Sequence, residues 1–149
     1  MSTDASHSPG GSASRTGVVI EVNGIVVHWT SHRQSMVTLS TCESEIIVHV
    51  IGFKLMIGIR DLIEEATGSK LNVVLEGDNM AAIHNLTNVV TNWRNMHSTK
   101  RAAWLRDEIK ATNVVLIHKK GTELVSDGLT KVLAKEKLGV ARHRLGLHV

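Results

Sequence analysis

The sequence predicts an α/β domain with a mixed β-sheet, and three observations support this. Two runs rich in β-branched residues meet at Asn23-Gly24, the dipeptide that most strongly signals a tight hairpin, so antiparallel strands are expected at 17–22 and 25–30. A long helical pattern follows the hairpin. Beyond it, strand-like and helix-like segments alternate, which is typical of parallel strands joined by helical crossovers.

The long helix is predicted from its boundaries and its periodicity. It begins in "LSTCESEIIVHV" (39–50), where Ser40 and Glu43 have the spacing of a capping box. Apolar residues then recur every three or four positions to Ala66, and Gly68 provides a stop signal. Gly52 and Gly58 weaken this helix locally and allow close packing.

The remaining elements follow in order. A buried strand is predicted at 71–76, after which Asp78 or its neighbour caps a short helix that runs through Leu86. A helix at 97–111 and a strand at 113–118 come next. Two basic segments, 122–133 and 135–145, are expected to be helical, and residues 5–14 read as a Gly/Ser/Pro loop.

Length and composition restrict the class of protein. A chain of 149 residues with 42% hydrophobic and 21% charged residues is expected to form one soluble domain over 1–149. The net charge of +3 is compatible with a polyanionic partner, and the single cysteine excludes an intrachain disulfide. Since no apolar run is long enough to cross a membrane and Asp4 and His7 interrupt any signal peptide, an intracellular location, cytoplasmic or nuclear, with no membrane partner is expected.

Four acidic residues stand at the ends of predicted elements: Asp4, Glu45, Asp78 and Asp127. Strand ends and adjacent helix starts face a common crevice in such sheets, so these carboxylates can converge. Converging carboxylates repel unless cations lie between them, and their hard oxygen atoms suit Mg²⁺ or Mn²⁺. Each acid also has a structural alternative, as a solvated terminal residue, a helix-dipole partner, a helix cap and an ion-pair member respectively.

Five segments in unbroken order resemble the ribonuclease H domain of copia-type (Pseudoviridae-like) LTR retrotransposons, which belongs to the reverse transcriptase polyprotein. The segments are "TGVVIEVNGIVVHWTSHRQSMVTLSTCESE", "LEGDNMAAI", "WRNMHSTKRAAWLRDEI", "ELVSDGLTKVL" and "RHRLGL". The match runs from Asp4 to Leu147. Where the family has cysteine, tyrosine and a basic residue, this chain has Gly77, Ile46 and Met96.

The resemblance implies a ribonuclease H-like fold with a mixed five-stranded sheet and flanking helices. It also implies a four-acid catalytic and metal site, with Asp4, Glu45, Asp78 and Asp127 in the family's four positions. Two Mg²⁺ or Mn²⁺ ions are the implied cofactors. The implied substrate contacts are His97, Arg33, Asn79, Arg94, Lys100 and Arg101.

The activity implied by the resemblance is metal-dependent hydrolysis of the RNA strand of RNA–DNA hybrids. The implied partners are the hybrid and the rest of a reverse transcriptase polyprotein. The alternatives are an inactive domain that binds nucleic acid or protein, and an element remnant. Only three residues precede Asp4, so the first strand, placed with the flexible loop in 1–16, is expected to be truncated and to hold Asp4 loosely.

Overall fold

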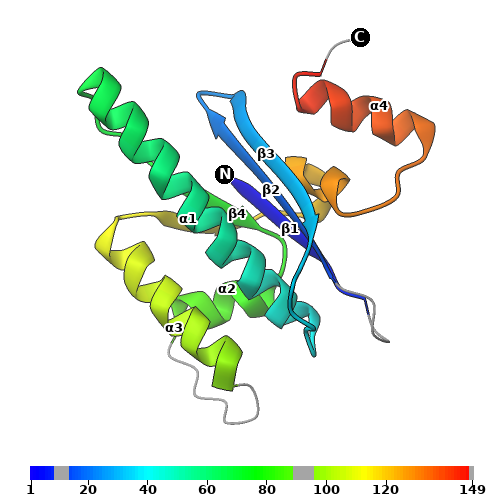
Figure 1. Ribbon diagram of the computed structural model, residues 1–149, viewed down its shortest axis with the longest axis horizontal. Coiled ribbons are helices and arrows are strands. Elements are labelled where there is room, and N and C mark those ends of the chain that lie inside the picture. The colour runs from blue at the N-terminus through cyan, green and yellow to red at the C-terminus, as the bar shows by residue number, and fades with distance from the viewer. Residues whose placement is uncertain (9–13, 89–95, 148–149) are drawn as a thin grey trace.

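The computed structural model describes residues 1–8, 14–88 and 96–147 and contains a mixed five-stranded sheet. Its order is β3-β2-β1-β4-β5 (Figure 1). The strands are β1 (Ser2–Ser6), β2 (Arg15–Val22), β3 (Ile25–Arg33), β4 (Val74–Gly77) and β5 (Val115–His118). β1 and β3 both pair antiparallel with β2, whereas β4 pairs parallel with β1 and β5. The predicted fold class is therefore confirmed.

Strand β1 lies at the centre of this sheet. It has five residues, fewer than the eight of β2, and all five pair with β2. Asp4 lies in the middle of the strand and is 2% exposed. The expectation of a loosely held Asp4 is therefore wrong, because neighbouring strands flank β1 on both sides. The loop predicted from residue 5 begins later, since Ala5 and Ser6 belong to the strand.

The hairpin forms where the sequence predicts it. Asn23 and Gly24 both have left-handed backbone angles, with φ of 52° and 79°. Two consecutive left-handed residues give a turn whose twist matches that of the flanking strands. The strands reach further than predicted, to Arg15 and Arg33.

Helix α1 (Thr41–Thr67) has the predicted boundaries. The backbone N–H of Glu43 donates to Ser40 Oγ at 3.1 Å, and the Glu43 carboxylate accepts from the N–H of Leu39 at 2.9 Å. At the other end Gly68 adopts φ 67° and donates to Glu64 O. Glu43 is thus a capping residue, in agreement with its predicted local role.

Helix α1 crosses one face of the sheet, and α2 (Met80–Thr87) and α3 (Met96–Ala111) pack beside it (Figure 1). The core between these helices and the sheet is built mainly from aliphatic side chains. Its buried members are Val18, Ile20, Ile46, Val48, Phe53, Met56, Leu75, Ala82, Leu86, Ala102, Leu105 and Val114.

The helix predicted at 122–133 is wrong. The chain instead forms two short 3-10 helices, η2 (Gly121–Glu123) and η3 (Val125–Leu129), before α4 (Lys135–Arg144). η3 packs on β1 and β2 so closely that a Cβ on Gly17 would lie 3.0 Å from Ser126 O. Such a close backbone approach leaves no room for the side-chain shell of a regular helix. α4 lies against η3, away from the sheet (Figure 1).

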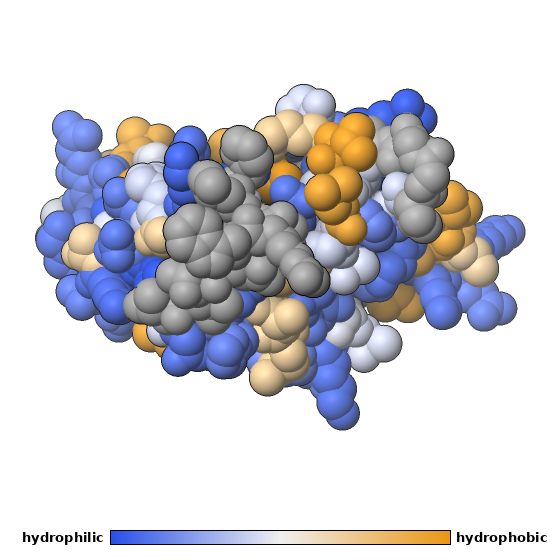
Figure 2. Space-filling view, turned by 90° about the horizontal axis from the view of Figure 1, so that it is seen from below, coloured by the Kyte–Doolittle hydropathy of each residue, from blue (hydrophilic) through white to orange (hydrophobic). Residues whose placement is uncertain are grey.

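Among the described residues, no helix combines the length and the apolar character needed to cross a membrane. Seen from below relative to Figure 1, the described surface is mostly hydrophilic, with hydrophobic side chains in separate groups (Figure 2).

Two glycines of α1 provide a test of its packing on β1. A Cβ on Gly52 would lie 2.8 Å from Thr3 Cγ2 and 3.0 Å from Met1 Sδ, whereas one on Gly58 would meet no described atom within 4 Å. Gly52→Ala is expected to destabilise the fold by about 1–3 kcal/mol through overpacking. Gly58→Ala, the matched control, is expected to stabilise it by about 0.5–1 kcal/mol through helix propensity. Urea denaturation measures both, and equal effects of the two substitutions would contradict the close packing.

Candidate active site

Three carboxylates from separate elements converge at one end of the sheet. Asp4 comes from β1, Glu45 from the second turn of α1, and Asp78 directly follows β4. Each offers an oxygen atom, and these atoms all lie within 4.8 Å of one another. The sheet topology explains the convergence, because β1 and β4 are parallel neighbours and their carboxyl ends point the same way.

Glu45 is fixed by the backbone of β1. The N–H of Ala5 donates to Glu45 Oε1 at 3.0 Å, and the side chain is 4% exposed. Glu45 Oε2 is buried and has no hydrogen-bond partner among the described residues. A buried carboxylate oxygen without a partner is costly, so its place beside two further carboxylates suits a bound cation.

Asp78 does not act as a helix cap, because its neighbour Asn79 caps the following helix. Asn79 is the N-cap of α2, and its Oδ1 accepts from the N–H of Ala82 at 2.9 Å. The Asp78 carboxylate is therefore available to the cluster. Asn79, a predicted substrate contact, uses its side-chain oxygen for the cap.

Asp127, the fourth predicted acid, lies in η3 beside the three converging carboxylates but outside their 4.8 Å group. A Cβ built on Gly121 would lie 2.7 Å from Asp78 Oδ2 and 3.5 Å from Asp127 Oδ1, so both carboxylates border the same glycine. Asp127 also forms an ion pair with Lys131 one turn later. The ion pair agrees with the structural alternative for Asp127, and its role as a site acid stays a prediction.

Three polar residues touch this site although the predicted site set omits them. Thr130 Oγ1 donates to Asp4 Oδ2, Lys131 Nζ donates to Asp127 Oδ1, and His118 Nε2 lies 3.0 Å from the carbonyl oxygen of Asp78. Lys131 lies four residues after Asp127, so its closeness in the sequence is the signal that could have found it. His118 gives no comparable signal, because it reaches Asp78 through the pairing of β5 with β4.

Burial and mutual repulsion raise the proton affinity of the cluster. Burial, and next the charge of Asp4, raise the pKa of Glu45 to about 8. Burial also raises the pKa of Asp4, and Asp78 and Asp127 add to this effect, while the Thr130 hydrogen bond opposes it. Groups whose charged forms are disfavoured in this way have a strong affinity for a compensating cation. The donor set of hard carboxylate oxygens therefore fits a divalent ion such as Mg²⁺ or Mn²⁺.

A buried histidine, His49, packs beside the carboxylate cluster. His49 lies one turn after Glu45, is fully buried, and places Nδ1 2.6 Å from the Glu45 carbonyl oxygen. Burial lowers the pKa of His49 to about 4. The His49 ring lies against Gly77, because a Cβ built on this glycine would lie 2.5 Å from His49 Nε2. The His49 ring therefore occupies the space that a side chain at position 77 would need.

Two of the residues predicted to contact phosphate lie close together in the structure. Arg33 and Arg101 line one pocket of about 370 Å³, together with Lys54 of α1, which the predicted set omits. Arg101 donates to Met36 Sδ at 3.0 Å, and Lys100 is exposed. Arg94 lies outside the described residues. His97 lies in the first turn of α3, and its side chain is outside the described part of the chain.

The fold is that of ribonuclease H. The chain is similar to the solved structure of LC11-RNase H1, isolated from compost by a metagenomic approach, with a TM-score of 0.60 and 16% identity over 96% of this chain and 89% of the other. A second structure of LC11-RNase H1, in complex with an RNA/DNA hybrid, gives a TM-score of 0.62 and 13% identity over 92% and 96% of the two chains.

Among curated proteins, the chain is similar to the retrovirus-related Pol polyprotein from transposon TNT 1-94 of Nicotiana tabacum. The two are 27% identical over 135 residues, which is 91% of this chain and 10% of the polyprotein. No protein-family model matches the chain. Its sequence and fold together fit a copia-type ribonuclease H domain.

The raised pKa of Glu45 predicts a pH dependence of stability in metal-free buffer. Between pH 6.5 and 8 the folded chain keeps the Glu45 proton that the unfolded chain, with a pKa near 4.5, has lost. The free energy of unfolding is therefore expected to fall as the pH rises, by about 1 kcal/mol per pH unit. His49 acts in the opposite direction, but only below its unfolded pKa of 6.5. Glu45→Gln is expected to remove this contribution. Urea denaturation in EDTA measures it, and equal slopes for the two proteins would contradict it.

The contact of Gly77 with His49 predicts an energetic coupling. Gly77→Ala is expected to destabilise the fold by about 1–3 kcal/mol, because the new methyl group meets the imidazole ring. In a His49→Ala background the same change is expected to cost at least about 1 kcal/mol less. A double-mutant cycle by chemical denaturation gives the coupling. Additive effects would show that the ring and the glycine do not share one space.

Proposed function

We propose that this chain is a metal-dependent endonuclease that hydrolyses the RNA strand of RNA–DNA hybrids. The observation that carries this proposal is the convergence of Asp4, Glu45 and Asp78, with Asp127 beside them, on a ribonuclease H-like fold. The hybrid bound by the structurally similar LC11-RNase H1 favours the same substrate class. The similarity to a Pol polyprotein favours a retrotransposon origin, with other parts of a reverse transcriptase polyprotein as partners.

In this proposal the four carboxylates hold two divalent ions, Mg²⁺ or Mn²⁺. When bound, such ions lower the pKa of water and stabilise the charge that develops on a departing oxygen. The chain's own residues position the ligands. The N–H of Ala5 orients one oxygen of Glu45 and leaves the other open to the site, and the hydroxyl of Thr130 orients Asp4. Positioning of this kind is part of what makes a metal site effective.

Recognition of the hybrid is proposed to depend on backbone shape and charge. The pocket lined by Arg33, Lys54 and Arg101 offers cationic groups suited to a phosphate. Lys100, Arg94, His97 and Asn79 remain proposed contacts on the basis of the family resemblance. Contacts to phosphates and 2′-hydroxyl groups read the shape of a hybrid without reading its bases.

Cleavage of an end-labelled RNA–DNA hybrid with Mg²⁺ tests the proposal. Asp78→Asn is expected to lower the rate at least 10²-fold, roughly the scale of losing a metal-site group. Asp107→Asn, the same charge change at an exposed position of α3, is the matched control and is expected to retain full activity. EDTA is expected to abolish cleavage, and a labelled DNA duplex is expected to remain intact.

Equal cleavage by the Asp78→Asn and wild-type proteins would refute this active site. Hybrid binding without cleavage by folded wild-type protein would instead favour a second function, a non-catalytic binding domain. The ion pair of Asp127 with Lys131 is the observation consistent with that second function, because it gives one of the four acids a structural partner.

A further inference from the structure

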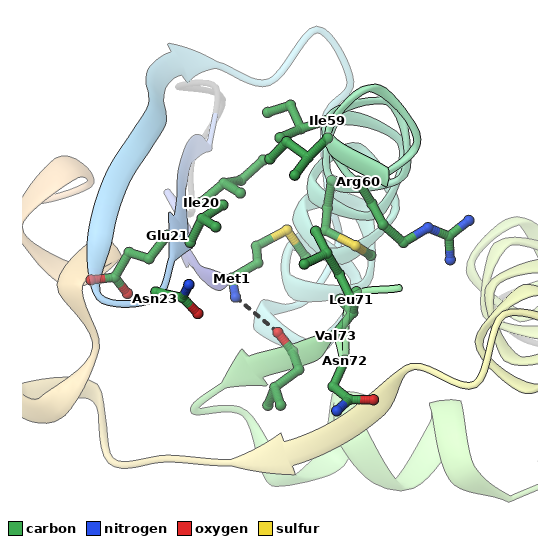
Figure 3. Close-up of a pocket in the computed structure, with 13 residues that line it drawn as sticks. Met1, Ile20, Glu21, Asn23, Ile59, Arg60, Leu71, Asn72 and Val73 are labelled. Atoms are coloured by element: carbon green, nitrogen blue, oxygen red, sulfur yellow. Dashed lines mark hydrogen bonds between the residues drawn. The ribbon is translucent and has the colours of Figure 1, made fainter. Parts of the chain in front are cut away.

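The acids of the candidate site are held in place in two different ways. Asp4 lies in β1 and Asp78 directly follows β4, and these two strands are paired in parallel. Their pairing is supported at the start of β1, where the nitrogen of Met1 donates to Val74 O at 2.8 Å (Figure 3). Asp127 lies instead in η3, which is not part of the sheet. The position of its carboxylate therefore depends on side-chain contacts.

Two consecutive side chains that follow η3 contact two of these acids. The hydroxyl of Thr130 donates to Asp4 Oδ2, and the ammonium of Lys131 pairs with Asp127 Oδ1. The charge of Lys131 also acts beyond its partner. Burial raises the pKa of Glu45 to about 8, and the positive charge of Lys131 opposes this rise. Lys131 thus supplies a positive charge at the place where the acids converge.

The ion pair of Lys131 with Asp127 is accessible from solvent. The side chain of Lys131 is 51% exposed and that of Asp127 is 24% exposed. Both line a pocket of about 640 Å³, together with Gly121, Thr122 and Lys137. Solvent screens a half-exposed ion pair and so makes it weak. Since the lysine stem is long and flexible, the ammonium can turn into this pocket without a change in the backbone.

We propose that the Lys131 ammonium competes with a second divalent ion for Asp127, so that the site holds its two ions with unequal affinity. The first ion is held by Asp4, Glu45 and Asp78, whose oxygen atoms lie within 4.8 Å of one another. Asp127 Oδ1 becomes free for a second ion only when Lys131 leaves it. This inference rests on the proposed metal-dependent nuclease and names the residue that sets its requirement for metal.

The balance of charge supports this competition. The three converging acids and Asp127 carry four negative charges once metal binding has removed their protons. One divalent ion leaves two of these charges, and Lys131 neutralises one more. A second divalent ion beside the ammonium would therefore give the site an excess of positive charge, whereas two ions without the ammonium balance the four acids. Binding of the second ion and the contact of Lys131 with Asp127 thus oppose each other.

Titration of the protein with Mn²⁺ in the absence of nucleic acid tests the proposal, with free Mn²⁺ counted by EPR. Lys131→Met is expected to raise the affinity for the second ion by about fivefold and that for the first by less than about twofold. Lys131→Gln repeats this test with another neutral side chain, and Lys131→Arg, which keeps the charge, is expected to raise neither affinity. Lys137→Met removes the same charge from the same pocket and is the matched control, with an expected change of less than about twofold.

In an Asp127→Asn background, Lys131→Met is expected to leave the Mn²⁺ affinity unchanged, because the two cations then have no shared carboxylate. Equal affinities for the second ion in the wild-type and Lys131→Met proteins would overturn the inference, and so would equal increases in Lys131→Met and Lys137→Met. Either result would leave the proposed nuclease unaffected. The absence of Mn²⁺ binding by folded wild-type protein would instead refute the metal site itself, and with it both the proposed function and this inference.

Discussion

The pairing of β1 with both β2 and β4 is the constraint on which the rest of the structure depends. This five-residue strand joins an antiparallel hairpin to a parallel pair, so it connects the two halves of the sheet. It also carries Asp4 into the interior and supplies the Ala5 N–H that holds Glu45. A strand in this position has no free edge, and each of its residues is fixed by backbone hydrogen bonds. The position of the acidic site therefore depends on the central strand of the sheet.

The carboxylates of the site repel one another, and the fold holds them close together despite this repulsion. Two buried carboxylates and a partly buried third converge, and the pKa values of Asp4 and Glu45 rise in response. The hydroxyl of Thr130, which donates to Asp4, and the ammonium of Lys131, which pairs with Asp127, partly offset this repulsion. Burial acts to lower the pKa of Lys131, but the hydrogen bond to Asp127 and the charges of Asp4, Asp127 and Asp78 outweigh it and raise this pKa. Such sites store unfavourable interactions that a bound cation relieves, so stability and metal affinity are linked.

The ring of His49 packs against Gly77 next to the site. It lies where a side chain at position 77 would lie. The neutral imidazole is held by the carbonyl oxygen of Glu45, in the same helix turn as the site acid. The backbone of β4 next to Asp78 is therefore packed against a residue of α1 that is distant in sequence.

Local signals in the sequence determined much of this protein. Asn23-Gly24 fixed the hairpin, because few residue pairs accept two left-handed backbone conformations. Ser40, Glu43 and Gly68 fixed both ends of α1, because caps act through neighbouring backbone groups. The order of the motifs, read through the family resemblance, selected Asp4, Glu45, Asp78 and Asp127 as one set.

Other features depended on contacts between distant segments and were decided only by the tertiary structure. The close approach of η3 to Gly17 replaced a predicted helix with 3-10 turns, and the cap formed by Asn79 left Asp78 available to the site. Likewise, His118 reached Asp78 through strand pairing, and the flanking strands buried Asp4 in a strand that its length alone suggested would be weak. Periodicity and propensity describe a segment by itself, whereas these outcomes depend on which backbone lies on the other side of it.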